Sequence, residues 1–185
     1  MNIILFGPQG SGKGTQAQLL CEKFGFYYFE SGEYLRRIAE TNNELKKMLD
    51  DGIMVPDIEL TSYLTAFLDQ ECLYDNILLD GFPRNLEQYN FLKIWLEHKQ
   101  VTIDLVLVLE ISKEETVKRL DKRKREDDTP DAIKNRLELY QTRTEPLIKE
   151  LEKVTVVRRL NGERSIEEIQ KDLVKIITDE IQLTP

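Results

Sequence analysis

Short apolar runs alternate along the chain with longer stretches of helical periodicity. The runs cover residues 3–6, 26–29, 77–79, 105–109 and 154–157, and their β-branched and aromatic residues favour buried strands. The run at 105–109 is apolar at every position, which is typical of a strand covered on both faces. Apolar residues at intervals of three and four predict helices between the runs. The pattern therefore predicts an α/β fold, a five-stranded parallel sheet flanked by helices, with ligands bound beyond the carboxyl ends of the strands.

Polar residues mark several predicted helix starts. Ser31 is expected to cap one helix, and residues 112–115 and 165–168 each form a capping box. Thr129-Pro130 opens a long helix that we expect to kink or stop near Pro146. The last helix carries an apolar stripe made of Ile166, Ile169, Leu173 and Ile176. The 185 residues contain no repeat or low-complexity linker, so they predict one domain of ordinary size.

The charge balance disfavours some classes of function. The chain has 26 basic and 34 acidic residues, a net charge of −8, which argues against general binding to nucleic acid or anionic membranes. Its two cysteines, Cys21 and Cys72, are far apart and lack the spacing of metal ligands. No apolar stretch approaches about 18 residues, and no basic segment precedes an apolar one at the N-terminus. We therefore expect a cytoplasmic protein with no nucleic-acid or membrane partner.

A glycine-rich loop directly follows the first predicted strand. Residues 7–15 read Gly-Pro-Gln-Gly-Ser-Gly-Lys-Gly-Thr and lead into the first predicted helix. Glycines let main-chain N–H groups close around phosphate oxygens, and the lysine and the helix N-terminus add positive charge. An ordinary strand-to-helix turn does not need this combination, so the sequence predicts a nucleotide phosphate site. Its predicted members are Gly10, Ser11, Gly12, Lys13, Gly14 and Thr15.

Asp80 ends the predicted strand at 77–79. An aspartate at the end of a buried strand beside a phosphate loop is placed to organise Mg²⁺ and its waters. The alternative is a turn-forming aspartate ahead of Gly81, and we favour the metal role because of the loop.

Arginines recur in the last third of the chain. Arg119 and Arg123 are four residues apart and share a helix face, so they can converge on one anion. A solvated helix face or a nucleic-acid patch are the alternatives for this basic run. Arg136 falls near the buried stripe of its helix, where a guanidinium needs a phosphate or carboxylate partner. We favour phosphate over the aspartates at 127–128, and Arg143, further along the stripe, has no predicted role.

Several segments of the chain match the motifs of one enzyme family. These segments are residues 7–16, 31–36, 52–57, 80–88, 119–120, 123, 125–128 and 135–137. In order and spacing they resemble the adenylate kinase family of nucleoside monophosphate kinases along nearly the whole chain. The resemblance implies reversible, Mg²⁺-dependent phosphoryl transfer from ATP to AMP, giving two ADP. It also implies a single P-loop kinase domain (1–185) with a monophosphate-binding clamp at 31–60 and a short lid at 123–132.

The resemblance implies roles for individual residues. The ATP site would use Gly10 to Thr15, Arg119 and the backbone near Arg164. The AMP site would comprise Ser31, Arg36, Ile53, Met54, Val55, Gly81, Phe82, Pro83, Arg84 and Gln88, with Gln88 against the base. The catalytic cations would be Lys13, Arg84, Arg123, Arg125 and Arg136. Asp80 would hold the Mg²⁺ through water.

Departures from the family pattern keep other functions open. Only Lys124 separates Arg123 from Arg125, so the lid cannot hold a zinc-binding hairpin and we expect no zinc. Ser31 stands where adenylate kinases usually carry threonine, a position that helps separate AMP from pyrimidine acceptors. Gln88 favours AMP, because relatives that use UMP or CMP tend to carry asparagine there. The rivals are a UMP/CMP kinase, a P-loop kinase of a small metabolite and a nucleotide-binding scaffold without turnover. We expect the chain to act as a monomer on small-molecule nucleotides.

Overall fold

The computed structural model describes residues 1–51, 53, 55–70, 74–123 and 129–183, and within these ranges the strands form a five-stranded parallel sheet. The strands are β1 (Ile3–Phe6), β2 (Tyr27–Glu30), β3 (Ile77–Asp80), β4 (Leu105–Glu110) and β5 (Val156–Asn161), in the order β2-β3-β1-β4-β5. The helices are α1 (Lys13–Phe24), α2 (Ser31–Ala39), α3 (Asn43–Asp50), α4 (Asp57–Gln70), α5 (Leu86–His98), α6 (Lys113–Arg123), α7 (Pro130–Leu139), α8 (Glu145–Leu151) and α9 (Ile166–Leu183). The α/β architecture expected from the sequence is confirmed.

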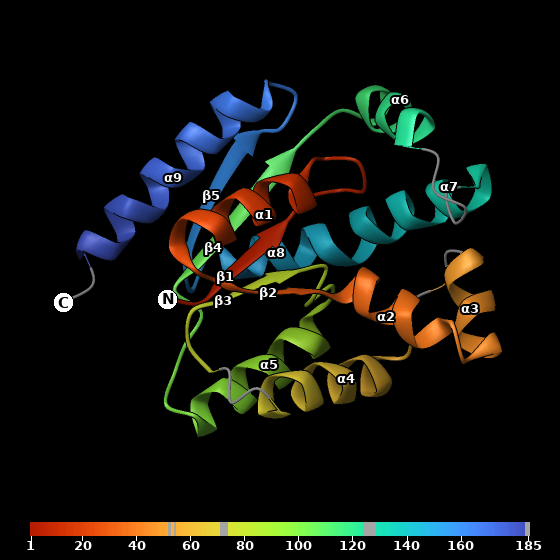
Figure 1. The fold of residues 1–185 in the computed structure, drawn as a ribbon, viewed down its shortest axis with the longest axis horizontal. Coiled ribbons are helices and arrows are strands. Elements are labelled where there is room, and N and C mark those ends of the chain that lie inside the picture. Colours follow the sequence, from red (N-terminus) through yellow and green to blue (C-terminus); the bar gives the residue numbers. More distant parts are fainter. Residues whose placement is uncertain (52, 54, 71–73, 124–128, 184–185) are drawn as a thin grey trace.

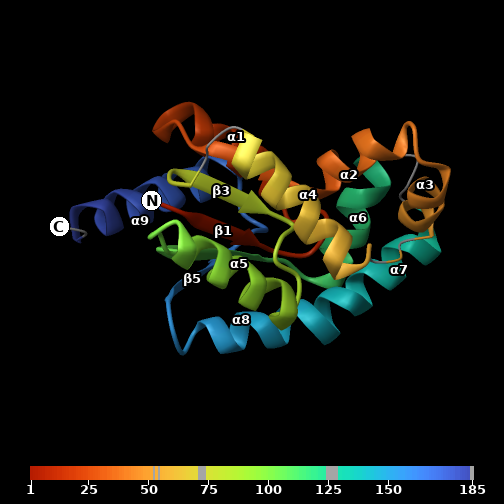
Figure 2. The same ribbon diagram turned by 90° about the horizontal axis from the view of Figure 1, so that it is seen from below.

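Alternation along β1 divides the core into two layers. Ile3 and Leu5 belong to the cluster that contains the apolar residues of α1 and α9. Ile4 and Phe6 point to the other face and pack in the cluster supplied by α4, α5 and α8. Figures 1 and 2 show these two helical layers on opposite faces of the sheet. Because both faces are covered, β1 is apolar at all four positions.

Helices also extend beyond the carboxyl edge of the sheet. In both views α2 and α3 lie at the same end of the molecule as α6 and α7 (Figures 1 and 2). The loop after β1, the end of β2 and the end of β3 open toward this end, since all strands run in the same direction. The topology therefore brings the predicted site residues to one edge.

The long helical segment after Thr129 continues past the expected break. Thr129 caps α7, its hydroxyl oxygen accepting from the Ala132 N–H at 3.2 Å. A π-helical turn, η1 (Tyr140–Thr144), then joins α7 to α8, and Pro146 lies in the first turn of α8. A proline cannot donate to the preceding turn, and the wider π turn is where the chain accommodates it.

The two predicted capping boxes differ in the structure. Ser165 and Glu168 form the complete box, with reciprocal bonds of 3.1 and 3.2 Å. In the other, Ser112 caps the Glu115 N–H at 3.2 Å, but the Ser112 N–H donates to Glu163 instead. Within the described residues, no helix combines the length and apolar character that a membrane span requires.

Three sequence predictions at the periphery need correction. The last strand begins at Val156 rather than at 154, because Val154 lies in an exposed turn, and it continues to Asn161. As an edge strand it pairs only with β4 and carries charged residues, which hid its extent. The second strand begins at Tyr27 rather than 26. In α9 the buried stripe is Ile169, Leu173 and Ile177, because Ile166 begins the helix half-exposed and Ile176 is only partly buried.

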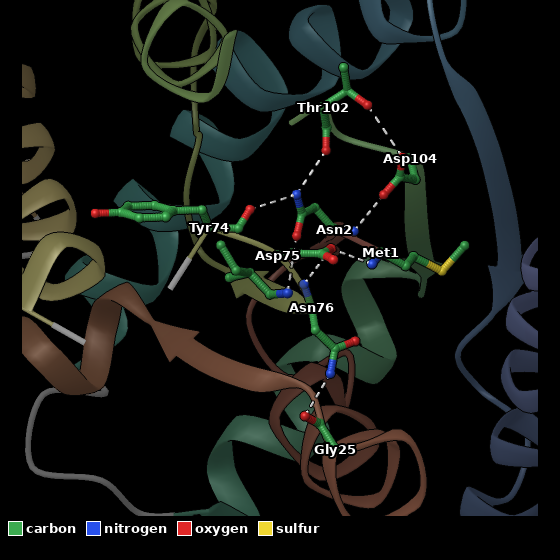
Figure 3. Close-up of polar contacts among 9 residues, drawn as sticks. Met1, Asn2, Gly25, Tyr74, Asp75, Asn76, Thr102 and Asp104 are labelled. Carbon is green, nitrogen blue, oxygen red and sulfur yellow. Dashed lines mark hydrogen bonds and ion pairs between the residues drawn. The ribbon is translucent and has the colours of Figure 1, made fainter. Parts of the chain in front are cut away.

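Asn2 closes the amino edge of the sheet (Figure 3). Its side-chain amide donates to the carbonyls of Tyr74 and Thr102 and accepts from the Ile77 N–H at 3.2 Å. Its main-chain N–H donates to Asp104, and the Met1 ammonium pairs with Asp75 at 2.6 Å. These contacts join the starts of β1, β3 and β4, so the polar groups at this edge satisfy one another.

Candidate functional site

A cavity of about 700 Å³ lies beyond the carboxyl edge, where the loops after β1 and β3 meet α2, α6 and α7. Its wall includes the whole segment 9–16, the floor residues Asp80 and Gly81, and positions 53 and 55 of the predicted clamp. The cationic side chains that line it are Lys13, Arg36, Arg84, Arg119, Arg123, Arg136 and Arg164. The described cations of the predicted site therefore share one cavity.

The phosphate loop turns into α1 with its lysine drawn back over the loop. Gly12 occupies the N-cap position with φ +91°, a left-handed conformation that side chains rarely adopt. Lys13 donates from Nζ to the carbonyl oxygens of Gly7 at 2.8 Å and Pro8 at 3.1 Å. Burial lowers the pKa of Lys13, while the nearby Asp80 carboxylate raises it. The Ser11 hydroxyl is buried and has no hydrogen-bond partner within the described chain, which leaves it available to a ligand.

Asp80 forms the floor of the cavity at the end of β3. Its side chain is buried, and it accepts a hydrogen bond from the Tyr28 hydroxyl at 3.1 Å. Burial raises the pKa of the Asp80 carboxyl, and the charge of Lys13 opposes the shift. Asp80 lines the cavity together with Thr15, and a carboxylate supplies the oxygen ligands that Mg²⁺ prefers. Among the described residues no group of three or more His, Cys, Asp or Glu side chains could hold a metal alone.

Arg84 is anchored beside this floor. Its Nε donates to the Gly81 carbonyl oxygen at 2.7 Å, and the Ser31 hydroxyl donates to the same oxygen at 2.7 Å. Thr144 of η1 donates to the Arg84 carbonyl oxygen at 3.1 Å. Burial lowers the pKa of the Arg84 guanidinium, with Asp80 opposing. The expectation that Ser31 caps α2 is wrong: Glu30 holds the cap position, and the Ser31 side chain is used to reach Gly81.

The predicted acceptor residues divide between the cavity wall and the layer behind it. Arg36, Ile53, Val55, Gly81, Pro83 and Arg84 line the cavity. Ser31, Phe82 and Gln88 are completely buried behind the wall. Gln88 accepts from the Arg84 N–H at 2.7 Å and donates to Asp57 at 2.6 Å. Met54 lies outside the described residues.

The arginines that the family resemblance assigns to the donor site and to phosphate binding are held in place by contacts of their own. Arg119 pairs with Glu115 at 2.8 Å and donates to the Gly162 carbonyl at 2.9 Å, and Arg164 pairs with Asp172 at 2.8 Å. Arg136 donates to the Leu49 carbonyl oxygen at 2.8 Å and so connects α7 to α3. The proposed alternative partners of Arg136 at 127–128, and Arg125 itself, lie outside the described residues. Arg143 is exposed and does not line this cavity.

Comparison with known proteins agrees with the geometry. The family model for adenylate kinase matches residues 5–156. The chain belongs to the adenylate kinase family. It is 42% identical over 152 residues to an adenylate kinase of Mycobacteroides abscessus, covering 80% of this chain and 84% of the relative. It is 37% identical to one of Leptospira biflexa (95% and 98% covered) and 34% identical to one of Bacteroides fragilis (96% and 98% covered).

Several residues that contact the candidate site of this adenylate kinase family member were not identified from the sequence. Tyr28, Glu30, Asp57 and Thr144 each contact a predicted site residue. The signal for Glu30 was its position at the end of a strand, since β2 and β3 pair with Glu30 opposite Asp80. Asp57 and Thr144 gave no comparable signal, because their partners lie 31 and 60 residues away.

Proposed function

We propose that the chain catalyses reversible phosphoryl transfer from ATP to AMP, with Mg²⁺, giving two ADP. The observation that carries the proposal is the shared cavity, in which arginines from α2, α6, α7 and the β3–α5 loop surround the phosphate loop. Membership of the adenylate kinase family supports the same reaction. The enzyme would act as a cytoplasmic monomer.

The donor site lies on the phosphate loop. Main-chain N–H groups from Gly10 to Thr15 bind the β- and γ-phosphates of ATP, aided by the N-terminal charge of α1. Lys13 leaves its contacts with the Gly7 and Pro8 carbonyls to bind a phosphate oxygen. Arg119 and the segment at Arg164 face the adenosine side of the donor.

The acceptor site lies between α2 and the loop after β3. Arg36 and Arg84 bind the phosphate of AMP, and the clamp residues Ile53 and Val55 cover the nucleoside. Gln88 contacts the adenine by exchanging one of its buried partners, Asp57 or the Arg84 N–H, for the base.

The reaction requires stabilisation of negative charge and alignment of the two nucleotides rather than a general base. The attacking phosphate oxygen of AMP is already anionic, so no proton has to be removed. Lys13, Arg123 and Arg136 approach the transferred group from different sides of the cavity and stabilise its charge. Asp80 would hold Mg²⁺ through water, and the ion would supply further neutralisation of the phosphates. Holding both nucleotides in one cavity fixes the reacting atoms in line.

A coupled assay of ADP formation tests the proposal with ATP, Mg²⁺ and a panel of AMP, CMP and UMP. We expect kcat/KM for AMP to exceed that for the pyrimidine acceptors at least about tenfold, because a site built to hydrogen-bond a base rejects bases that cannot pair with it. A higher kcat/KM with CMP or UMP would instead identify a pyrimidine kinase. No turnover with any of the three would contradict nucleoside monophosphate kinase activity.

A further inference from the structure

Two carboxylates end neighbouring strands beneath the cavity. β2 and β3 are parallel and pair Glu30 with Asp80, each the last residue of its strand, so their side chains leave the sheet at the same level. The Tyr28 hydroxyl lies between them, 3.1 Å from Asp80 Oδ2 and 3.3 Å from Glu30 Oε2. One carboxylate oxygen of Glu30 is therefore held by the Tyr28 hydroxyl, and the other is directed toward α2.

The second oxygen of Glu30 contacts Arg36. Glu30 Oε1 accepts from Arg36 Nη2 at 3.1 Å, and both residues line the cavity. A carboxylate offers a guanidinium the same anionic oxygens that a phosphate offers, so the two ligands compete for one set of N–H donors. The acceptor phosphate can therefore use all the N–H donors of Arg36 only after Glu30 releases Nη2.

We propose that Glu30 is a built-in competitor for the acceptor phosphate, which neutralises Arg36 in the empty cavity and is displaced when the monophosphate binds. The inference rests on the proposed function, because that function makes Arg36 a phosphate ligand. Glu30 also places a negative charge beside the incoming dianion. Both effects weaken acceptor binding, so Glu30 sets a KM for the monophosphate that is higher than the arginines alone would give.

The size of the effect follows from the exposure of the pair. The side chains of Arg36 and Glu30 are 34% and 22% exposed, which means that water screens their interaction. A partly exposed ion pair of this kind corresponds to about a two- to fivefold change in affinity. The ATP site lies on the phosphate loop, where no hydrogen bond to Glu30 is found among the described residues. The charge of Glu30 acts on Lys13 only as one of the smaller influences, so the affinity for ATP should change little.

The test is Glu30→Gln. The amide keeps one oxygen that can accept from Tyr28 or Arg36, replaces the other oxygen with an NH2 group and removes the charge at almost unchanged size. We expect the KM for AMP at saturating ATP to fall about two- to fivefold, the KM for ATP to stay within about 1.5-fold, and the dissociation constant of AMP measured by calorimetry to fall with its KM. An unchanged or higher KM for AMP in a variant with a native circular dichroism spectrum would overturn the proposal.

A matched control separates the contact from general electrostatics. Glu33, in the first turn of α2, lines the same cavity, and among the described residues it forms no ion pair with Arg36. Glu33→Gln should lower the KM for AMP less than Glu30→Gln does. Equal effects of the two variants would show that only the overall field matters and would contradict the proposal.

A double-mutant cycle tests whether the effect of Glu30 on AMP binding depends on Arg36. In an Arg36→Met background, adding Glu30→Gln should lower the dissociation constant of AMP less than it does in the wild-type background, because the contested donor is gone and only the charge repulsion remains. A fall as large as in the wild-type background would overturn the proposal. Failure of the proposed function is a separate result: it would appear as absent ADP formation by the wild-type enzyme, whereas the calorimetric comparison needs only binding of AMP.

Discussion

The two edges of the sheet use polar residues in opposite ways. At the amino edge, Asn2, Asp75 and Asp104 bind main-chain groups of neighbouring strands and the Met1 ammonium, all at hydrogen-bond distance. At the carboxyl edge, Lys13, Asp80 and Arg84 are charged groups in a buried setting. Burial lowers the pKa of Lys13 and of Arg84 and raises the pKa of Asp80. In each case burial favours the neutral form, because the charged form is poorly solvated.

The difference shows where the free energy of folding and the free energy of binding reside. Polar groups that satisfy one another stabilise the fold and have nothing left for a ligand. Charged groups that are desolvated without full compensation destabilise the empty protein, and a ligand of opposite charge can recover that cost. Substitutions at the amino edge should therefore change stability, and substitutions at the carboxyl edge should change turnover.

The largest expected effect is at the carboxyl edge. Lys13→Met should lower kcat at least about a thousandfold, because it removes a cation that stabilises the transferred phosphoryl group. The far-UV circular dichroism spectrum should stay native. Lys23→Met, an exposed lysine of the same helix, serves as the control and should keep the wild-type rate. A Lys13→Met enzyme of near-normal rate would remove the contrast between the two edges.

The opposite pattern is expected at the amino edge. Asn2→Ala should lower the free energy of unfolding by about 2–3 kcal/mol, because it leaves the Tyr74 and Thr102 carbonyls and the Ile77 N–H without their partner. Urea denaturation measures the change, and KM and kcat at 25 °C should stay within about twofold. Asn43→Ala, at an exposed helix position, should be nearly neutral. A loss of activity in folded Asn2→Ala would show that the two edges are coupled.

An intermediate effect is expected at Gln88, which lies behind the cavity wall. Gln88→Ala should raise the KM for AMP about tenfold and the KM for ATP less than twofold, because a lost buried hydrogen bond to the base costs about 1.4 kcal/mol. Asn85→Ala also loses a contact with Asp57, together with the cap on the Gln88 N–H, but should shift the KM for AMP less. If both variants raised it equally, the effect would pass through Asp57 or the start of α5 rather than through the base.

The smallest effect is expected from the exposed ion pair of the amino edge. The hydrogen bond from the Met1 ammonium is the main cause that lowers the pKa of Asp75, followed by the Asn76 N–H. A carboxyl whose folded-state pKa is lowered stabilises the protein above its unfolded pKa and loses this effect as the pH falls through the folded pKa. Asp75→Asn should therefore lower the free energy of unfolding at pH 7 by less than about 1 kcal/mol. The difference between variant and wild type should shrink in urea titrations as the pH falls below the ordinary range of an aspartate carboxyl, and a difference that did not shrink with falling pH would assign it to another cause.

The sequence predicted the centre of the fold better than its periphery. β1, β3 and β4 are covered on both faces, so their uninterrupted apolar runs marked them to within about one residue. β2, at one edge of the sheet, was also placed to within one residue, whereas the charged residues of β5, at the other edge, hid its extent. The buried stripe of α9 shifted by one position because helical spacing permits either Ile176 or Ile177 on the inner face.

The candidate site could be predicted wherever its residues are adjacent to strand ends. The phosphate loop, Asp80 and Arg84 all follow strands directly, and the parallel topology brings strand ends together. The burial of Gln88 and the contact between Glu30 and Arg36 could not be predicted, because they depend on how α4 and α5 pack and on how β2 turns into α2. Assignment of each arginine to donor or acceptor stays a prediction from the family resemblance.

The main-chain carbonyl of Gly81 has a consequence for redesigning acceptor preference. Its oxygen accepts hydrogen bonds from the Ser31 hydroxyl and from Arg84 Nε, and a Cβ at position 81 would lie 2.5 Å from the Ser31 hydroxyl. The contact between the start of α2 and the loop after β3 thus relies on a main-chain atom that every amino acid possesses, at a position whose positive φ favours glycine. Mutant libraries that keep residues 31, 81 and 84 constant can vary the other residues lining the cavity without disrupting these hydrogen bonds.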